Sequence, residues 1–232
     1  MKRFYQSAQT VPAAAGYGIT LDGRLVKTPA KHDLIVPSVA LAAAVAAEWT
    51  AQREEIRLAA MPLMRLSSTA IDRVRTQRQG VVEQVGNYAA TDLVCYRAAH
   101  PPPLAARQQA VWQPLIDWAV LRYDAPLAVT SGVIPKSQPA ASLRALAAAV
   151  AARDDFTLTA LHAATTACGS LVIALALVEE QIDAAEAFAA SELDESFQIE
   201  AWGEDAEQSE RRRLLAADIE AAARFMALLR AR

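Results

Sequence analysis

The sequence predicts an α+β protein in which a small β-rich N-terminal domain is followed by a C-terminal helical bundle. Strand-like segments and turn residues occur in the first part of the chain, whereas everything from residue 139 onward has a helical pattern. Hydrophobic residues make up 53% of the chain and aromatic residues only 6%. Because alanine supplies much of that hydrophobic content, closely packed helices are favoured. We expect two domains, residues 1–135 and 136–232.

The N-terminal segment predicts a β-hairpin. Residues 17–21 and 25–28 are strand-like and flank Asp22-Gly23, a pair that readily adopts the positive φ angles of a tight turn. A third short strand is expected at residues 32–36, where Pro37 ends it because proline has no N–H to donate.

A helix is expected at residues 39–52, directly after these strands. Ser38 precedes it and belongs to the residue types that cap helix N-termini. Trp49 shares one helix face with Leu41 and Val45 through i, i+4, i+8 spacing. We therefore predict that Trp49 is a core residue.

The middle of the chain alternates helical and strand-like segments. Pro62 interrupts the crossing segment 56–64, and Gly80 is expected to separate two helices. Pro114 is expected to kink the next long helix, on which Trp118 is predicted to be a core residue. The predicted elements are helices 66–79, 81–88 and 104–122 and strands 92–97 and 127–134.

The C-terminal region contains a long apolar stretch that predicts a buried helix at residues 156–181. Residues 157–178 contain no charged side chain and show no period-two alternation, so Leu171 is placed in the core. A membrane span is the alternative, but His162 and Ser170 would need partners in lipid, and no Lys or Arg anchors the downstream end. The other expected helices are 140–152, 184–202 and 204–229.

Charge is unevenly distributed, although the net charge is only −3. Between Asp154 and Glu210 there are fourteen acidic residues and no Lys or Arg, while the flanking segments are basic. This polarity indicates either a docking face for a basic partner or internal neutralisation within the fold, and both interpretations stay open.

The cysteines and the N-terminus predict a cytoplasmic protein. Cys95 and Cys168 lack CxxC spacing and lie in apolar surroundings, which favours reduced, buried side chains. No secretory signal or organelle presequence is visible before the first predicted strand.

A search for catalytic motifs gives nothing. The three histidines are dispersed and form no metal set, and no nucleophile motif or phosphate-binding glycine loop is present. The arginines of helix 66–79 lack interleaved aromatic residues, so no nucleic-acid site is expected. We therefore predict no catalytic residues, no metal, no cofactor and no membrane insertion, and a binding protein rather than an enzyme.

The acidic helix that ends at Trp202-Gly203 is the best candidate for a binding surface. Leu193, Phe197 and Ala201 form an inward stripe by i, i+4, i+8 spacing, which places Phe197 in the core. Glu192, Glu195 and Asp194 are expected to lie away from that stripe, and Gln198 and Trp202 at its edge. Aromatic residues beside charged groups are typical of protein interfaces. The alternative is that Trp202 belongs to the core.

A set of short motifs, in order over nearly the whole chain, resembles the assembly-chaperone family that binds the unassembled α subunit of the ATP synthase catalytic sector. The motifs are Arg3-Phe4-Tyr5, Gly16–Pro29, Glu48-Trp49 with Gln52, Met61-Pro62 with Thr69–Asp72, Tyr88 with Thr91–Arg97, Trp112–Leu115 with Asp117–Ala119, Ser170-Leu171, and Asp194–Gln198 with Trp202–Asp205.

The resemblance implies a two-domain chaperone without catalytic activity, whose partner is the α subunit until the β subunit replaces it. A bacterial copy would fit the lack of a presequence. The family's important acidic position corresponds best to Glu195, with Asp194 as its neighbour. The predicted partner-binding residues are Glu192, Asp194, Glu195, Gln198, Trp202 and Asp205. Two alternatives stay open, namely a generic protein-binding module with another client and an enzyme that uses carboxylates in a cleft.

Overall fold

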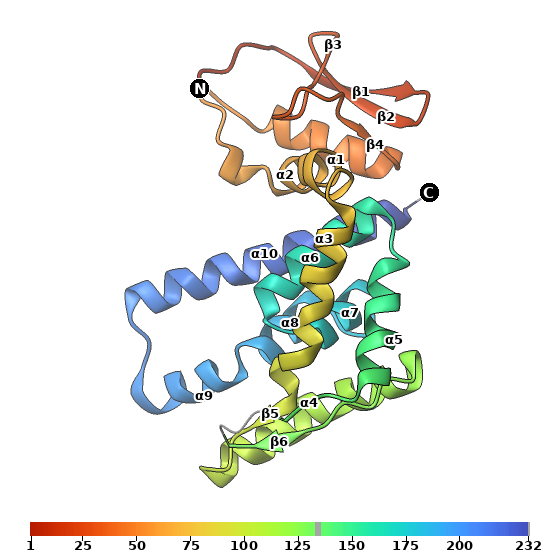
Figure 1. The fold of residues 1–232 in the computed structure, drawn as a ribbon. Coiled ribbons are helices and arrows are strands. Elements are labelled where there is room, and N and C mark those ends of the chain that lie inside the picture. Colours follow the sequence, from red (N-terminus) through yellow and green to blue (C-terminus); the bar gives the residue numbers. More distant parts are fainter. Residues whose placement is uncertain (133–135, 232) are drawn as a thin grey trace. The chain divides into compact units, whose positions relative to one another are not determined.

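A computed structural model describes residues 1–132 and 136–231 (Figure 1). The chain forms two units, of which unit 1 comprises Met1–Arg78, Asp154–Ala160 and Arg224–Arg232, and unit 2 comprises Gln79–Arg153 and Leu161–Ala223. The predicted fold class is confirmed, because a small antiparallel sheet comes first and mostly helical structure follows. The predicted domains 1–135 and 136–232 stay a prediction, and position 135 lies outside the described residues.

The antiparallel sheet of unit 1 is built around its second strand. The strands are β1 (Ala8–Ala13), β2 (Gly16–Leu21), β3 (Arg24–Leu25) and β4 (Ile35–Val36). Strand β2 pairs with β1 over its whole length, and its two ends pair with β3 and β4. The predicted hairpin is confirmed, since Asp22 and Gly23 have φ angles of 47° and 80°. The sequence did not predict β1, and β4 is shorter than the predicted strand 32–36.

The helix predicted at residues 39–52 is α1 (Val39–Thr50), which packs on this sheet. The Ser38 hydroxyl caps it by accepting a hydrogen bond from the N–H of Leu41 at 3.1 Å. Leu41, Val45 and Trp49 are all buried, which confirms the predicted inward face.

After α1 the chain forms a series of short helical segments, η1 (Leu58–Ala60), α2 (Pro62–Thr69), the π-helical η2 (Ala70–Val74) and α3 (Arg78–Gly86). The predicted interruption at Gly80 is wrong, because α3 runs through it. Gly80 falls in the first turn of α3, where backbone N–H groups have no intrahelical partner and glycine therefore disturbs little.

The next segment contains the 3₁₀ helices η3 (Asn87–Thr91) and η4 (Leu93–Cys95) and then the strand β5 (Tyr96–Arg97). Strand β5 pairs in parallel with β6 (Thr130–Ser131). The predicted strand 92–97 is therefore wrong for most of its length, since Asp92 caps η4 by accepting from the N–H of Val94. The predicted strand 127–134 is confirmed only at β6, and its positions 133 and 134 lie outside the described residues.

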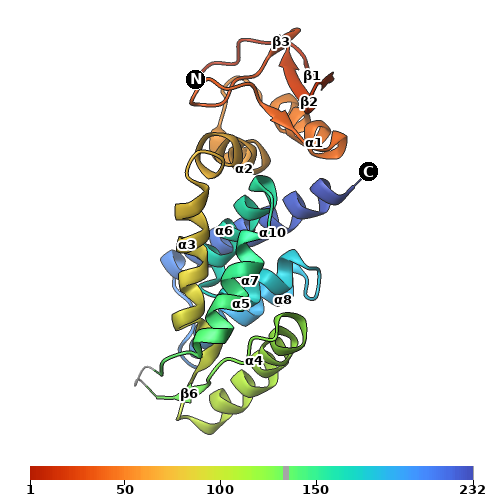
Figure 2. The ribbon, with the colours of Figure 1, turned by 45° about the vertical axis from the view of Figure 1, so that its right-hand side comes forward.

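The remaining helices are α4 (Pro102–Tyr123), α5 (Ala140–Ala151), α6 (Asp155–Cys168), α7 (Leu171–Val178), α8 (Ala184–Ser191), α9 (Leu193–Trp202) and α10 (Ala206–Arg230). In unit 2, α4 packs against α5 and α7, and α7 packs against α8 (Figure 2). All eight residues of α7 are buried, so this helix forms the centre of the unit 2 core. No helix among the described residues combines the length and apolar character needed to cross a membrane.

Two predicted helices are each divided into two. The predicted helix 156–181 breaks at Gly169, which has a φ of 63°, and the predicted helix 184–202 breaks at Glu192. Both breaks have tertiary causes. Ser170 starts α7 and its hydroxyl donates to the buried Asp92 at 2.5 Å, while the indole N–H of Trp112 binds the carbonyl of Ala190 just before the second break.

Candidate partner-binding site

The predicted site residues lie on a helical hairpin of unit 2, formed by α9, residues 203–205 and the first half of α10. We call residues 193–215 the α9–α10 hairpin. Gly203 ends α9 with a φ of 84°, and its N–H donates to the carbonyl of Ile199 at 2.8 Å. Asp205 then starts α10 by accepting a hydrogen bond from the N–H of Gln208 at 2.8 Å. The connection is short, so α9 and α10 face each other along the hairpin.

Glu192, at the base of the hairpin, is held by two arginines from α10. Arg211 Nη2 lies 2.7 Å and Arg212 Nη1 2.9 Å from the same carboxylate oxygen, Oε2. The side chain of Glu192 is buried, so the prediction that it lies away from the core is wrong. A buried carboxylate needs such partners, because desolvation would otherwise make its charge unfavourable.

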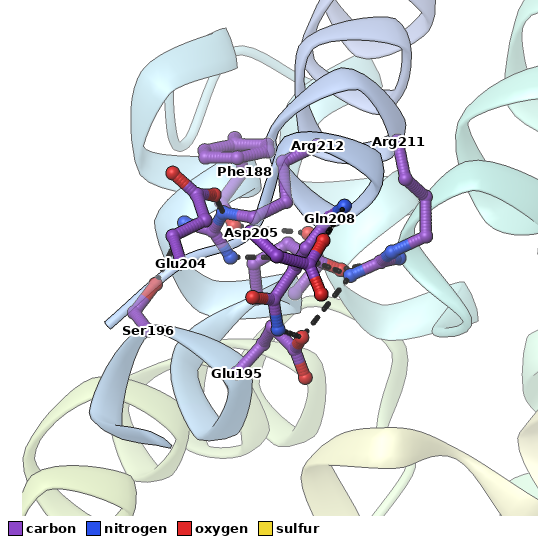
Figure 3. A network of polar contacts seen from close by, with 10 residues as sticks. Phe188, Glu195, Ser196, Glu204, Asp205, Gln208, Arg211 and Arg212 are labelled. Carbon is purple, nitrogen blue, oxygen red and sulfur yellow. Dashed lines mark hydrogen bonds and ion pairs between the residues drawn. The ribbon is translucent and has the colours of Figure 1, made fainter. Parts of the chain in front are cut away.

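Arg212 contacts several residues of the hairpin (Figure 3), and its side chain is only 15% exposed. Besides Glu192, its guanidinium donates to the Ser196 hydroxyl at 3.0 Å and lies 3.3 Å from Glu204. It also stacks over the ring of Phe188 in α8, 5.1 Å from the ring centroid. This one side chain therefore fixes α9 against α10 and both against α8.

Glu195 is held more weakly than Glu192. The side-chain amide of Gln208 donates to its carboxylate, and the nearest guanidinium nitrogen, on Arg211, is 3.9 Å away (Figure 3). Its side chain is 29% exposed. Glu195 therefore keeps a partly accessible carboxylate whose ion pair is at the distance limit of such contacts.

Asp194 points toward the body of unit 2. Its carboxylate accepts a hydrogen bond from the side-chain amide of Gln108 at 2.7 Å. Gln108 lies buried in α4. Its side-chain oxygen accepts a hydrogen bond from the N–H of Ala98, and its backbone carbonyl accepts one from the guanidinium of Arg97. Asp194 is thus one end of a polar chain that fixes the start of α9.

A further ion pair links α9 to α4. Arg107 of α4 binds Glu200 through two hydrogen bonds of 2.6 and 2.9 Å, and its guanidinium lies 5.3 Å from the ring centroid of Phe197. The hydrogen bonds from Arg107 hold the pKa of Glu200 below its usual range. Phe197 is half-buried under this contact rather than sealed in the core.

The end of α9 is open. Trp202 is 81% exposed and Gln198, one turn earlier, is exposed as well, so the alternative that Trp202 belongs to the core is wrong. Of the other residues predicted to form the core, Trp49 and Leu171 are buried, and Trp118 is half-buried. The structure therefore separates the site residues into a fixed set and an exposed set. The fixed set, whose carboxylates accept hydrogen bonds within unit 2, is Glu192, Asp194 and the exposed Asp205. The exposed set is Glu195, which is partly exposed, with Gln198 and Trp202.

Sequence reasoning missed the arginines that organise this site. The run Arg211–Arg213 follows the acidic segment directly, and its position after Trp202-Gly203 could have indicated a hairpin that brings opposite charges together. No local signal identifies Arg107, which lies 93 positions from its partner Glu200. Internal neutralisation, one of the two interpretations of the charge distribution, is confirmed for Glu192 and Glu200.

The described residues contain no group of three or more His, Cys, Asp and Glu side chains placed to hold a metal ion. Cys95 and Cys168 are buried, and burial raises the pKa of both thiols to about 12. Such thiols are not activated nucleophiles, since nucleophilic cysteines have a lowered pKa. The α9–α10 hairpin presents an exposed indole at Trp202, an exposed amide at Gln198 and a partly exposed carboxylate at Glu195.

The fold of this chain is that of a family of chaperone proteins. A family profile described as ATP12 chaperone protein matches residues 2–120. The structure of Atp12 from Paracoccus denitrificans is 42% identical in sequence, with a TM-score of 0.94 over 99% of this chain and 98% of that chain. A structure of an aspartate-to-lysine mutant of P. denitrificans Atp12p gives the same values.

The Atu1473 protein of Agrobacterium tumefaciens is 38% identical, with a TM-score of 0.94 over 99% of this chain and 86% of that chain. These similarities extend over both units. The chain belongs to the ATP12 chaperone family.

Proposed function

We propose that this chain binds the unassembled α subunit of the ATP synthase catalytic sector, keeps it in solution and releases it when the β subunit takes its place. Membership of the ATP12 chaperone family supports a role in ATP synthase assembly. The observation that carries the site assignment is Trp202, whose side chain is 81% exposed at the end of the helix that also carries the partly accessible carboxylate of Glu195. The relatives are bacterial proteins, which supports an action in the bacterial cytoplasm.

The physical demand on such a chaperone is a moderate and reversible grip. An unassembled subunit exposes the surface of a permanent interface, and such surfaces are large and apolar. A chaperone that covers this surface must later give it up, so part of its binding energy should come from accessible charges, which speed encounter and can be exchanged. An aromatic anchor supplies the apolar part, because tryptophan is enriched among residues that dominate binding energy.

Within this proposal the fixed and exposed residues have different roles. Glu192, Asp194 and Asp205 position α9 and α10, since each already accepts hydrogen bonds within unit 2. Glu195, Gln198 and Trp202 make the contacts with the α subunit. The loose pair between Glu195 and Arg211, at 3.9 Å, leaves the carboxylate able to exchange Arg211 for a basic group of the partner.

An enzymatic role has less support. Among the described residues, the carboxyl groups whose pKa is raised are Glu48 and Asp92, and burial is the largest cause in both. Both are tied to backbone amides, Glu48 to those of Leu63 and Met64 at 2.8 Å and Asp92 to that of Val172 at 3.1 Å. Carboxyl groups held in this way serve the fold, whereas a general acid or base must reach a substrate.

Co-expression tests the proposal. The tagged chain and the α subunit of the same bacterium are produced together, the chain is captured, and purified β subunit is then added. We expect α to be captured with the chain and to be released by β. Capture of other proteins without α would favour the generic binding module, and failure to capture any α would contradict the proposal.

A pair of variants places the contact on the α9–α10 hairpin. Glu195→Gln removes the charge but keeps an oxygen that accepts from Gln208, so the hairpin should stay intact. We expect weaker capture of α, with less dependence on salt, because one accessible charge is lost. Glu220→Gln, an exposed carboxylate later on α10, is the matched control and should leave capture unchanged.

A further inference from the structure

One face of α4 holds the break between α8 and α9 from both sides. Gln108 and Trp112 are four positions apart on α4, so their side chains lie one turn apart on the same face. The indole N–H of Trp112 donates to the carbonyl of Ala190 at 2.8 Å. The side-chain amide of Gln108 donates to the carboxylate of Asp194 at 2.7 Å. These two partners lie on either side of Glu192, so this face of α4 fixes the direction in which α9 leaves α8.

The amide of Gln108 has one orientation that satisfies both of its neighbours. Gln108 is 1% exposed, and its side-chain oxygen accepts a hydrogen bond from the N–H of Ala98 at 2.6 Å. The N–H of Ala98 only donates and the ionised carboxylate of Asp194 only accepts, so the side chain between them must offer one acceptor and one donor, as an amide does. The order of donors and acceptors from Ala98 to Asp194 is therefore fixed.

A buried positive charge lies next to Gln108. The guanidinium of Arg97 donates to the backbone carbonyl of Gln108 and lies 5.2 Å from the ring centroid of Trp112. Arg97 is buried, and burial lowers the pKa of its guanidinium. Among the residues that the structure describes, no carboxylate forms an ion pair with Arg97. A carboxylate introduced at position 108 would therefore lie beside a cation that favours its charged form.

The ion pair that also links α4 to α9 is poorly placed to fix the start of α9. The side chains of Arg107 and Glu200 are 40% and 58% exposed, and Glu200 lies near the end of the helix. Exposed ion pairs contribute little to stability. Loss of a buried hydrogen bond costs more, because the group left behind has no partner. The hold of α4 on the first turn of α9 therefore depends mainly on Gln108.

We propose that Gln108 is a positioning residue for the α9–α10 hairpin, and that Asp194 acts on the partner through Gln108 and does not contact the partner itself. The inference rests on the proposed binding of the α subunit. While the amide holds Asp194, the first turn of α9 is fixed, and Glu195 and Trp202 are presented in one arrangement. Without this hydrogen bond, that arrangement is populated for only part of the time, and the apparent affinity falls by the same fraction.

Exchange of the donor and the acceptor tests the proposal, with the affinity for the α subunit of the same bacterium measured at about pH 8, where a carboxyl group beside Arg97 is ionised. Gln108→Glu places two carboxylates against each other and should lower the affinity about tenfold. Gln108→Glu combined with Asp194→Asn pairs an acceptor with a donor in reversed order and keeps the net charge of the wild type. This double variant should recover the affinity to within about threefold. Asp194→Asn alone still offers an oxygen to Gln108 and should stay within about twofold.

A second readout follows α9 in the chain alone. Amide hydrogen exchange of residues 193–202 should be faster in Gln108→Glu than in the wild type and should return toward the wild-type rate in the double variant. If Gln108→Glu does not fold by itself, recovery of folding and affinity in the double variant is the same rescue and supports the proposal.

Two results would overturn the inference. A double variant as defective as Gln108→Glu would show that the two side chains do not act as a pair. A loss of affinity in Asp194→Asn as large as that in Gln108→Glu would show that Asp194 contacts the partner directly. If the wild-type chain does not bind the α subunit, the proposed function fails, whereas the exchange rates of α9 still decide whether Gln108 positions this helix.

Discussion

Unit 2 contains two polar networks that differ in how completely they are buried. The first surrounds Asp92, which is fully buried and accepts hydrogen bonds from the Ser170 hydroxyl and from the backbone amides of Val94 and Val172. The second joins α9 and α10 through Arg211 and Arg212 and is only partly buried, since Arg211 is exposed. The Asp92 network joins residues 78 and 80 positions apart, whereas the α9–α10 network joins residues 16 to 20 positions apart.

The two networks differ in which side-chain atoms they leave accessible to a binding partner. Asp92 has no accessible atom for a partner, and its contacts fix where α7 begins. In the α9–α10 hairpin the network covers Glu192 but leaves Glu195 partly exposed and Trp202 open. Carboxylates of the same chemistry thus serve the fold in one place and a binding surface in the other, and burial decides which.

The largest expected effect is the loss of Asp92. Asp92→Ala leaves the Ser170 hydroxyl and two backbone N–H groups buried without their acceptor, so we expect the free energy of unfolding to fall by about 3 kcal/mol. Urea unfolding monitored by circular dichroism measures it. Asp117→Ala, an exposed carboxylate on α4, should change stability by about 0.5 kcal/mol or less. Similar midpoints for the two variants would refute the distinction between the networks.

The pH dependence of stability tests the same network without breaking it. Burial raises the pKa of Asp92 from 3.8 to about 6 in the folded protein. Between these values the folded state binds more protons than the unfolded state, so stability should fall as the pH rises from about 4 to about 6. The loss should be about 3 kcal/mol at most. The difference in free energy of unfolding between the wild-type chain and Asp92→Asn, measured across this pH range, isolates the contribution of Asp92. A difference that does not change with pH would contradict the assigned effect of burial on its pKa.

A smaller effect is expected in the hairpin. Arg212 is 15% exposed and binds Glu192, Ser196 and Glu204. Arg212→Ala should therefore lower the free energy of unfolding by about 2 kcal/mol, because charged hydrogen bonds to a buried carboxylate are lost. The neighbouring Arg213 is exposed and, among the residues that the structure describes, pairs with the exposed Glu210 alone, so Arg213→Ala should leave stability almost unchanged. Thermal unfolding of the two variants compares them directly, and equal destabilisation would show that Arg212 does not join the hairpin.

Local signals in the sequence were sufficient to predict the hairpin turn and the start of α1 in unit 1. Asp22-Gly23 and Ser38 each act on neighbouring residues, and both predictions are confirmed. Strand β1 was missed because Ala8–Ala13 contains Pro12 and little strand-forming character, and its partner β2 supplies the order.

The predictions failed where distant residues decide the structure. The break at Gly169 depends on the bond between Ser170 and Asp92, 78 positions apart, and glycine alone is tolerated within helices. The burial of Glu192 depends on α10 folding back over α9, which the helical pattern does not indicate. For the candidate site, the sequence identified the helix that ends at Trp202-Gly203, but it left the exposure of Trp202 open and did not indicate which carboxylates remain accessible.

Retention of the α subunit in solution by a Trp202 variant tests the central claim most directly. Trp202→Ala removes an exposed side chain, so stability should change by about 0.5 kcal/mol or less. Leu121→Ala, at an 89% exposed apolar residue of α4, is the matched control. Light scattering of isolated α subunit mixed with each chain should rise with Trp202→Ala and stay low with the wild type and Leu121→Ala. Equal protection by Trp202→Ala and the wild type would contradict the account.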